Sequence, residues 1–330
     1  MNLDDLAGVV ALTEISGIGD KRALELHQTF EGIDDLLDSP RDAFSEFHYV
    51  DAEAYDSLQS LEPTIEETRQ RFERHRADGI DVIGIEDDRY PAALAAQHSP
   101  LVIYTKGNTE LLEQRSVSFS GSRETNATGQ KWAREMAQDL AAEGYAIVSG
   151  GALGADTAAH EGALAAGGAT IVVLGTGVET PHPAENEPLF EEIVHAGGVL
   201  ISHRRPTAGP TRAGFLGRNK TLSALSPGLV IVATDGSGGT MSQYDDATTQ
   251  ERRVFVPSST PDIRPYEGIT EIRNTGSPLT IETETEIIEW YQQENAAQST
   301  EPNSDTETGR SDDDTGQATL ADWGPDTDEY

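Results

Sequence analysis

The sequence contains no cysteine, which excludes disulfide bonds, zinc sites built from thiolates and catalysis by a thiol. Its eight histidines are scattered, with no two at metal-ligand spacing on one expected helix, so we expect no metal and no cofactor. The sequence also lacks the run of roughly 20 apolar residues that spans a bilayer, and its first residues lack the basic start of a leader. We therefore expect a soluble, cytoplasmic protein that makes no contact with a membrane.

Basic residues are scarce, and lysine is the scarcest of them. The chain has 58 acidic residues against 23 basic ones, a net charge of −35, and only four lysines. Acidic residues are dense from Asp4 to Asp88 as well as near the C-terminus, so an acidic tail on an ordinary protein explains only part of the excess. The pattern favours a protein adapted to molar salt.

The 330 residues are enough for more than one domain, and composition along the chain predicts three parts. Residues 1–75 have the pattern of short helices. Residues 76–292 are expected to form an α/β core. Residues 293–330 are rich in Ser, Thr, Asp, Glu, Gly and Pro, so we expect a disordered acidic tail.

The core alternates apolar strands with amphipathic helices. The expected strands are 117–120, 145–148, 170–174, 199–201, 229–233 and 254–256, and helices are expected at 131–143, 156–166 and 185–196. This alternation predicts a mostly parallel sheet with helices on both faces. In such sheets, ligands bind beyond the carboxyl ends of the strands.

Glycine-bearing turns follow four of these strands, at 121–123, 149–156, 175–177 and 235–240. Glycine lets the backbone approach a ligand closely, and the next helix offers free N–H groups to an anion. Many such turns use glycine for geometry alone, but four at one edge favour a nucleotide or nucleic-acid site. Arg123 ends the first turn and could pair with a phosphate; it could also be a surface arginine that offsets nearby carboxylates.

A segment without acidic residues runs from Ile193 to Thr234, where the average density of the chain would place about seven. The same segment holds five cations, Arg204, Arg205, Arg212, Arg218 and Lys220. Burial would explain the missing charge in residues 229–233, but it does not explain five cations before them. The segment therefore indicates a surface that binds a polyanion.

Several motifs occur in a fixed order over residues 8–260. They are Tyr90-Pro91, Gly121-Ser122-Arg123, Ser149-Gly150-x-Ala152-x-Gly154-x-Asp156, Leu174-Gly175-Thr176-Gly177, Pro183-x-x-Asn186 and Phe215-x-x-Arg218-Asn219-Lys220. Together they resemble the DprA/Smf family, the DNA-processing protein A proteins. The resemblance implies an extended Rossmann-like fold, single-stranded DNA binding in a basic pocket, loading of a RecA-type recombinase, a homodimer and no catalytic turnover.

Carried onto this chain, the resemblance implies a set of pocket residues. They are Gly121, Ser122, Arg123, Ser149, Gly150, Arg218, Asn219, Lys220 and Gly239. The chain departs from the family pattern at Leu153, where an arginine is usual, at His203, where a glutamate is usual, and at Lys220, where a second arginine is usual. Arg204 or Arg205 could compensate for the missing arginine. At about 1 M salt the Debye length is about 3 Å, so binding needs short-range contacts, and Phe215 is the best-placed aromatic for base stacking.

The two ends of the chain carry further motifs. Residues 12–26 resemble a helix-hairpin-helix with a Gly17-Ile18-Gly19 turn, which could hold a DNA phosphate or serve as a protein-interaction or packing unit. Near the C-terminus, Gln317, Leu320 and Trp323 resemble a peptide that binds a sliding clamp. This short pattern could also be an incidental match.

Two rival functions would use the same pocket. Residues 236–243 are similar to the glycine-rich signature of nucleotide phosphoribohydrolases, whose last position is a catalytic glutamate. Gln243 stands there in this chain and cannot exchange a proton at neutral pH, which argues against an enzyme. A sensor that binds a nucleotide-derived signal is the other rival.

Overall fold

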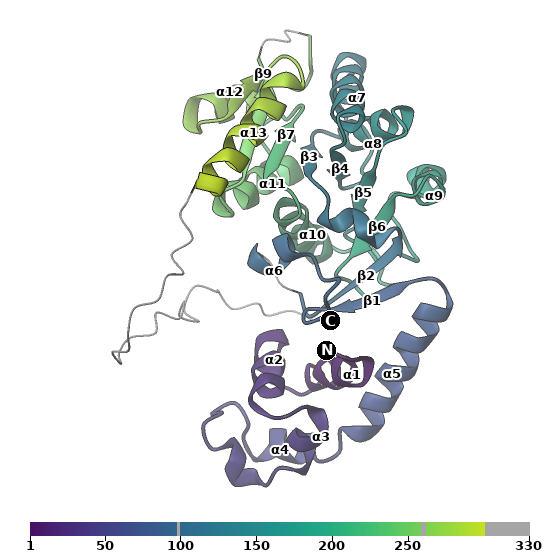
Figure 1. Cartoon of the computed structure of the whole chain (residues 1–330), viewed down its shortest axis with the longest axis vertical. Helices are drawn as coiled ribbons and strands as arrows, with labels where there is room; N and C mark the ends of the chain where they lie inside the picture. Colours follow the sequence, from purple (N-terminus) through teal and green to yellow (C-terminus); the bar gives the residue numbers. More distant parts are fainter. Residues whose placement is uncertain (98–99, 259–261, 301–330) are drawn as a thin grey trace. The chain divides into compact units, whose positions relative to one another are not determined.

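The computed structural model describes residues 1–97, 100–258 and 262–300 (Figure 1). Residues Met1–Ile287 form one compact unit, and Ile288–Tyr330 are a second unit. In the described ranges, no helix is both long and apolar enough to cross a bilayer. The domain boundaries expected at residues 75 and 292 stay predictions, and the clamp-like peptide lies outside the described residues.

Short helices make up the first part of the chain. They are α1 Leu3–Leu12, α2 Asp20–Thr29, α3 Ile33–Asp38, η1 Arg41–Phe44 (a 3-10 helix), α4 Ala52–Leu58 and α5 Glu62–Ala77. Each contributes apolar residues to one cluster, in which Leu12, Leu26 and Phe72 are fully buried. The burial of these side chains is what stabilises helices of this length, because most of them are too short to persist alone in water.

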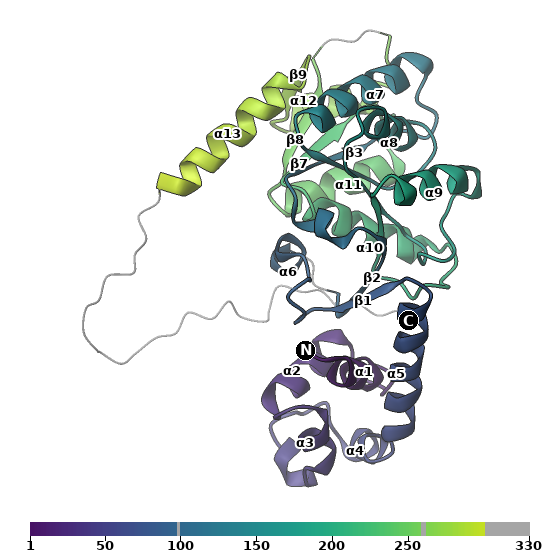
Figure 2. The same ribbon diagram turned by 45° about the vertical axis from the view of Figure 1, so that its right-hand side comes forward.

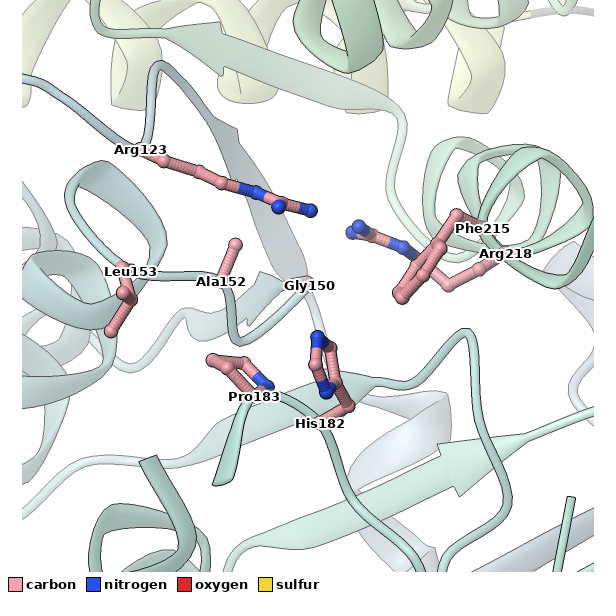
Figure 3. A pocket seen from close by; sticks show the side chains of 8 residues that line it. All are labelled: Arg123, Gly150, Ala152, Leu153, His182, Pro183, Phe215 and Arg218. Atoms are coloured by element: carbon pink, nitrogen blue, oxygen red, sulfur yellow. The ribbon is translucent and has the colours of Figure 1, made fainter. Parts of the chain in front are cut away.

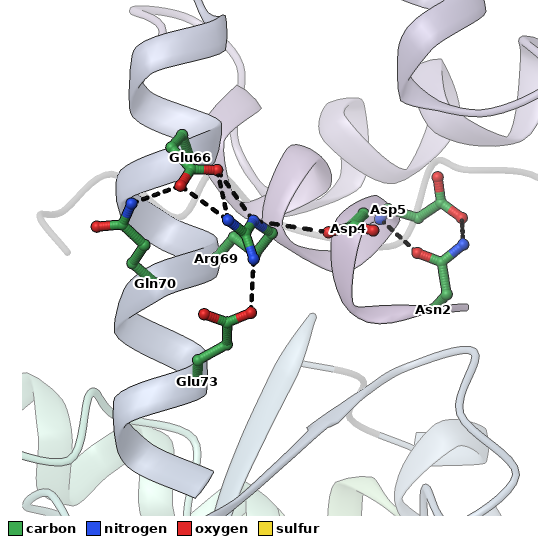
Figure 4. Close-up of polar contacts among 7 residues, drawn as sticks. All are labelled: Asn2, Asp4, Asp5, Glu66, Arg69, Gln70 and Glu73. Atoms are coloured by element: carbon green, nitrogen blue, oxygen red, sulfur yellow. Dashed lines mark hydrogen bonds and ion pairs between the residues drawn. The ribbon is translucent and has the colours of Figure 1, made fainter. Parts of the chain in front are cut away.

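Polar contacts connect α1 to α5 (Figure 4). Arg69 on α5 lies 2.8 Å from Glu66, 2.5 Å from Glu73 and 3.9 Å from Asp4 of α1. Its hydrogen bond to Glu66 lowers the pKa of that carboxyl and raises the pKa of the guanidinium. Asn2 caps α1 by accepting a hydrogen bond of 2.9 Å from the backbone N–H of Asp5.

The core is built on one sheet, to which nine strands belong in the described part of the chain, in the order β1-β2-β6-β5-β4-β3-β7-β8-β9. The strands are β1 Asp81–Gly84, β2 Val102–Gly107, β3 Ser116–Ser120, β4 Ala146–Ser149, β5 Thr170–Val173, β6 Val199–Ser202, β7 Gly228–Ile231, β8 Arg253–Pro257 and β9 Leu279–Ile281. From β6 to β9 along this order the neighbours are parallel, while β2 is antiparallel to β1 and β6. The predicted mostly parallel sheet is confirmed.

Helices cover both faces of the sheet, as the alternation predicted (Figures 1 and 2). They are α6 Ala92–Gln97, η2 Thr109–Glu113, α7 Ala127–Ala142, α8 Ala155–Ala165, η3 Ala184–Asn186, α9 Glu187–His195, α10 Arg212–Ala224, α11 Gly238–Thr249 and α12 Glu267–Thr275. The helix that follows β9 in the chain is α13 Thr285–Thr300. On β5, Ile171 and Val173 pack in a cluster with Leu222 of α10, whereas Val172 packs in the cluster of Phe190 of α9. Successive residues of a strand point to opposite faces, so both sides of β5 are buried.

One helix begins earlier than the periodicity predicts. Helix α7 starts at Ala127, four residues before the expected Lys131. The side chain of Asn126 accepts a hydrogen bond of 3.0 Å from the backbone N–H of Gly129, and this cap allows polar residues to form the first turn.

The parallel strands bring the glycine turns to one edge of the sheet. The strands β5, β4, β3 and β7 lie next to one another in this order, and each is parallel to its neighbour. The turns that follow them therefore leave the sheet at the same edge. The backbone N–H of Ser122 donates to the carbonyl of Ala233 over 2.8 Å, which fixes the turn after β3 against the end of the β7 segment. The candidate site lies among these turns.

Candidate nucleic-acid interface

A pocket opens at this edge between three loops and one helix (Figure 3). Its empty volume is about 330 Å³, counting the open solvent at its mouth. The lining residues are Arg123 after β3, Gly150, Ala152 and Leu153 after β4, His182 and Pro183 after β5, and Phe215 and Arg218 on α10. The pocket thus forms at the strand ends where the parallel sheet predicts a ligand site.

Arg218 is the most constrained side chain of the pocket. It is 8% exposed, and its Nε is buried without a hydrogen-bond partner among the residues that the structure describes. Burial lowers its pKa, and the nearby Asp156 only partly opposes that change. A desolvated cation whose charge is only partly compensated is costly, so a bound anion at this position would stabilise the site.

Glycine at position 150 makes room for this arginine. A Cβ atom on Gly150 would lie 1.5 Å from Nη1 of Arg218, so the guanidinium rests directly on the backbone of this turn. Gly154, with φ +83°, makes a second close approach, because a Cβ there would lie 2.6 Å from the carbonyl oxygens of Ser122 and Arg123. The glycines of the second turn therefore pack it against both arginine-bearing segments.

Arg123 faces Arg218 across the pocket, and the two guanidinium groups point toward one another (Figure 3). Arg123 is exposed, and its charge contributes to the lowered pKa of Arg218. The turn that carries it is held by the hydroxyl of Thr125, which donates to the carbonyl of Ser122 over 2.8 Å. Two cations in this arrangement repel one another, and an anion between them would relieve the repulsion.

A buried carboxylate lies close to the arginine pair. Asp156 is 5% exposed, and its Oδ2 accepts a hydrogen bond of 3.2 Å from the backbone N–H of Ala152. Burial raises the pKa of this carboxyl, while the positive charge of Arg218 acts in the opposite direction. Asp156 thus places an acidic group near the positive centre without forming an ion pair with it.

The wall beside Arg218 is aromatic. The rings of His182 and Phe215 have centroids 5.9 Å apart and are tilted by 54°. Phe215 is partly exposed and packs on Gly175, where a Cβ would lie 2.5 Å from its Cδ1. An apolar ring beside a cationic centre suits a base attached to a phosphate.

The pocket brings together four of the predicted site residues, Arg123, Gly150, Phe215 and Arg218. Others support its frame: Gly121 packs on Ala155, the buried Ser149 donates its hydroxyl to the carbonyl of Phe119 over 2.8 Å, and Ser122 fixes its turn. Asn219 is buried and donates to the carbonyl of Gly239 over 3.3 Å. These residues position the loops without lining the pocket.

Three predicted cations are not among the lining residues. Arg204 donates to the hydroxyl of Thr211 over 3.2 Å, and Arg205 forms an ion pair of 2.5 Å with Glu14 in the helical part. Lys220 is exposed on α10, where its charge opposes the burial that raises the pKa of Asp246 to about 6. The basic residues of the acid-free segment therefore have different neighbours, and only Arg218 of them lines the pocket.

The sequence reasoning did not single out His182 and Pro183 as site residues. A signal for this loop was present, because Pro183-x-x-Asn186 was among the motifs. The side chain of Asn186 is buried and donates to the carbonyl of Gly151 over 2.8 Å, which connects the loop after β5 to the turn after β4.

The fold and the pocket define a Rossmann-like α/β protein with a pocket lined by two arginines at the carboxyl edge of its sheet. The sequence model of the family described as DNA recombination-mediator protein A matches residues 81–292. The chain belongs to this family of DNA recombination mediators, which includes the proteins named DprA and Smf.

Individual relatives agree with this assignment. Protein Smf of Synechocystis is 28% identical over 279 residues, which are 82% of this chain and 69% of the relative. The structure of DprA from Streptococcus pneumoniae matches with a TM-score of 0.67 at 24% identity and covers 87% of this chain and 97% of its own. DprA from Helicobacter pylori, whose structure concerns a single-stranded DNA binding mode, matches with a TM-score of 0.58 at 26% identity and covers 65% and 96%. In four curated relatives the match spans 44% to 69% of the relative's own length.

Proposed function

We propose that this protein binds single-stranded DNA in the arginine pocket and acts as a recombination mediator without catalytic turnover. The observation that carries the proposal is the buried Arg218, whose Nε has no hydrogen-bond partner among the described residues, opposite Arg123. A phosphate between the two guanidinium groups would supply the missing counter-charge. The single-stranded DNA binding described for the Helicobacter pylori relative supports the same choice of ligand.

The shape of the pocket favours a single strand over a duplex. A phosphate between Arg123 and Arg218 would carry its base toward the rings of Phe215 and His182. A base can reach such a wall only when it is not stacked and paired inside a helix. Phe215 would contribute affinity that does not depend on charge, since stacking is worth about 1–3 kcal/mol per base.

We test the proposal by fluorescence anisotropy with a labelled single strand and its duplex in about 1 M potassium chloride. Arg218→Ala should weaken single-strand binding about tenfold or more, because hydrogen bonds to charged groups are worth roughly 1.5–3 kcal/mol. Lys220→Ala is the matched control, since it removes a cation from the same helix that does not line the pocket. Equal binding of duplex and single strand, or wild-type affinity in Arg218→Ala, would contradict the proposal.

The absence of turnover is part of the proposal. Gln243, at the position of the catalytic glutamate in the rival enzymes, is 3% exposed, and its amide nitrogen has no partner among the described residues. An amide cannot donate and recover a proton in hydrolysis. Incubation with nucleoside monophosphates should therefore release no free base, whereas release would favour the phosphoribohydrolase. Tight binding of a monophosphate without release would favour the sensor.

The proposal extends to partners. A mediator delivers its single strand to a RecA-type recombinase, and a second copy of the chain would lengthen the DNA-binding surface. The peptide with Gln317, Leu320 and Trp323 lies outside the described residues, and we propose it as an anchor for a sliding clamp. Pull-down of the clamp should fail after deletion of residues 315–330, while recombinase pull-down should be unaffected.

A further inference from the structure

The pocket has an apolar side chain at each end, with the arginine pair between them (Figure 3). Phe215 lies at one end beside Arg218. Leu153 lies at the opposite end of the view, next to Ala152 and on the side of Pro183. Leu153 is 40% exposed, so the rest of the protein covers only part of this side chain. A single exposed leucine is ordinary, but this one lines a pocket that also holds the buried Arg218, whose Nε has no hydrogen-bond partner among the described residues.

This arrangement matches the chemistry of an internal phosphodiester. A phosphodiester links two nucleosides, so an anion held between Arg123 and Arg218 carries a base on each side. One base would meet the ring of Phe215, and the other would meet the side chain of Leu153. A mononucleotide would fill only one of these two ends.

We propose that the pocket binds a dinucleotide unit of a single strand, with its phosphodiester between the arginines and one base against each apolar end. This inference rests on the proposed function and names the unit of DNA that the site takes. Leu153 is then a specificity-determining residue, which selects an internal step of the strand over a single nucleotide.

Salt dependence gives this choice of residue a physical reason. Phosphate contacts weaken steeply as the salt concentration rises, whereas contact between a base and an apolar side chain does not lose strength by counterion release. Leu153→Arg should therefore bind a single strand with a steeper salt dependence, by about 0.7 in the slope of log affinity against log salt for one added phosphate contact.

The deciding experiment uses competition against a labelled single strand bound to the full chain in about 1 M potassium chloride. The competitors are the dinucleotide dTpT and thymidine 5′-methyl phosphate, which has the same phosphodiester charge but only one base. Leu153→Ala should weaken competition by dTpT about fivefold to tenfold, because it removes apolar surface that the second base would cover, and should leave the one-base competitor unchanged. Leu216→Ala is the matched control, because Leu216 is 43% exposed on α10 and is not among the lining residues.

The outcomes distinguish failure of the dinucleotide inference from failure of the proposed function. One outcome is that the wild-type chain binds single strands while dTpT competes equally well on Leu153→Ala and on the wild type. In that case the dinucleotide inference is wrong and the proposed function stands. If dTpT and thymidine 5′-methyl phosphate compete equally well on the wild-type chain, the dinucleotide inference is also wrong and the proposed function also stands. If the wild-type chain, folded in this salt, binds no single strand, both proposals fail together.

Discussion

At the scale of single residues, the site is a balance between two guanidinium groups and one buried carboxyl. Arg218 and Asp156 are both nearly inaccessible to water, and burial disfavours the charged form of each. Their mutual attraction offsets part of this cost but also reduces the field that the arginines can offer to a phosphate. If the pocket binds DNA as proposed, we expect the carboxyl of Asp156 to lower its affinity for a phosphate.

Removal of this carboxyl charge should strengthen DNA binding. Asp156→Asn keeps the shape and the oxygen that accepts from the backbone N–H of Ala152. We expect affinity for a single strand at neutral pH to rise about fivefold, which corresponds to roughly 1 kcal/mol. Competition by unlabelled strand against a labelled one measures the change, with circular dichroism to confirm the fold.

The same carboxyl gives a pH dependence whose sign follows from its raised pKa. Protonation removes the negative charge near the arginines, so wild-type affinity should rise as the pH falls toward the pKa of Asp156. Asp156→Asn should lack this part of the increase. Asp246→Asn is the control, because the pKa of Asp246 is also raised, to about 6, but its carboxyl is near Lys220 rather than in the pocket. Parallel pH profiles for wild type and Asp156→Asn would show that Asp156 does not tune the site.

At the scale of elements, the sequence predicted the frame of the site better than its contacts. Alternating apolar strands and helices require a parallel sheet, and parallel strands require that the turns after β3, β4 and β5 share an edge. Helical periodicity also separates Lys220 from the pocket-lining residues of α10: Phe215 and Arg218 stand three residues apart and share a face of the helix, and Lys220 lies on another face. The sequence motif Phe215-x-x-Arg218-Asn219-Lys220 does not show this separation, so it predicted that Phe215, Arg218 and Lys220 belong to one site.

The remaining contacts depend on tertiary packing. Arg205 pairs with Glu14, which is 191 residues away in the chain, and no local pattern identifies such a partner. The pocket's His182 comes from a loop that is joined to the β4 turn through Asn186 and Gly151. Only the folded chain brings these segments together, so a charge count along the sequence assigns both Arg205 and Arg218 to one surface.

The turn after β4 offers a direct test of how elements build the pocket. Gly150→Ala places a methyl group where Nη1 of Arg218 lies, so the arginine must leave its position. We expect single-strand affinity to fall about tenfold and the free energy of unfolding to fall by about 1–3 kcal/mol, as for overpacked sites. Anisotropy and thermal unfolding give the two readouts.

Gly239→Ala provides the comparison for this change. A Cβ at Gly239 meets no atom within 4 Å, so stability should stay within about 0.5 kcal/mol of wild type. Gly239 was also predicted to contact DNA, and a loss of affinity without a loss of stability would support that prediction. Wild-type affinity in Gly150→Ala would show that Arg218 does not need its present position.

At the scale of the whole molecule, a net charge of −35 opposes the approach of any polyanion. In the proposed complex the two guanidinium groups would contact a phosphate directly, whereas the carboxylates spread over the rest of the chain would repel an approaching strand from a distance, where salt screens them more strongly. The Debye length is about 30 Å at 0.01 M salt and about 3 Å at 1 M. Adaptation to molar salt stays a prediction, but this contrast in range gives it a measurable consequence for binding.

Affinity for a single strand should pass through a maximum as salt increases. Added salt first screens the repulsion between the strand and the acidic chain, so the association rate should rise between about 0.1 M and 1 M. At higher salt the loss of counterion release prevails, with a slope of about −0.7 for each phosphate contact, and the few contacts of this pocket keep that slope shallow. Stopped-flow anisotropy across the salt range measures both limbs, restricted to concentrations at which the protein is folded.

Truncation of the chain separates long-range repulsion from changes within the pocket. Deletion of residues 301–330 removes ten acidic residues and one arginine without altering a lining residue. The truncated chain should associate faster with DNA than the full chain at low salt, and the two should converge near 1 M, where screening confines electrostatics to direct contacts. Arg218→Ala should instead lower affinity at every salt concentration. An affinity that falls steadily from the lowest salt, with equal rates for the full and truncated chains, would show that counterion release dominates despite the acidic surface.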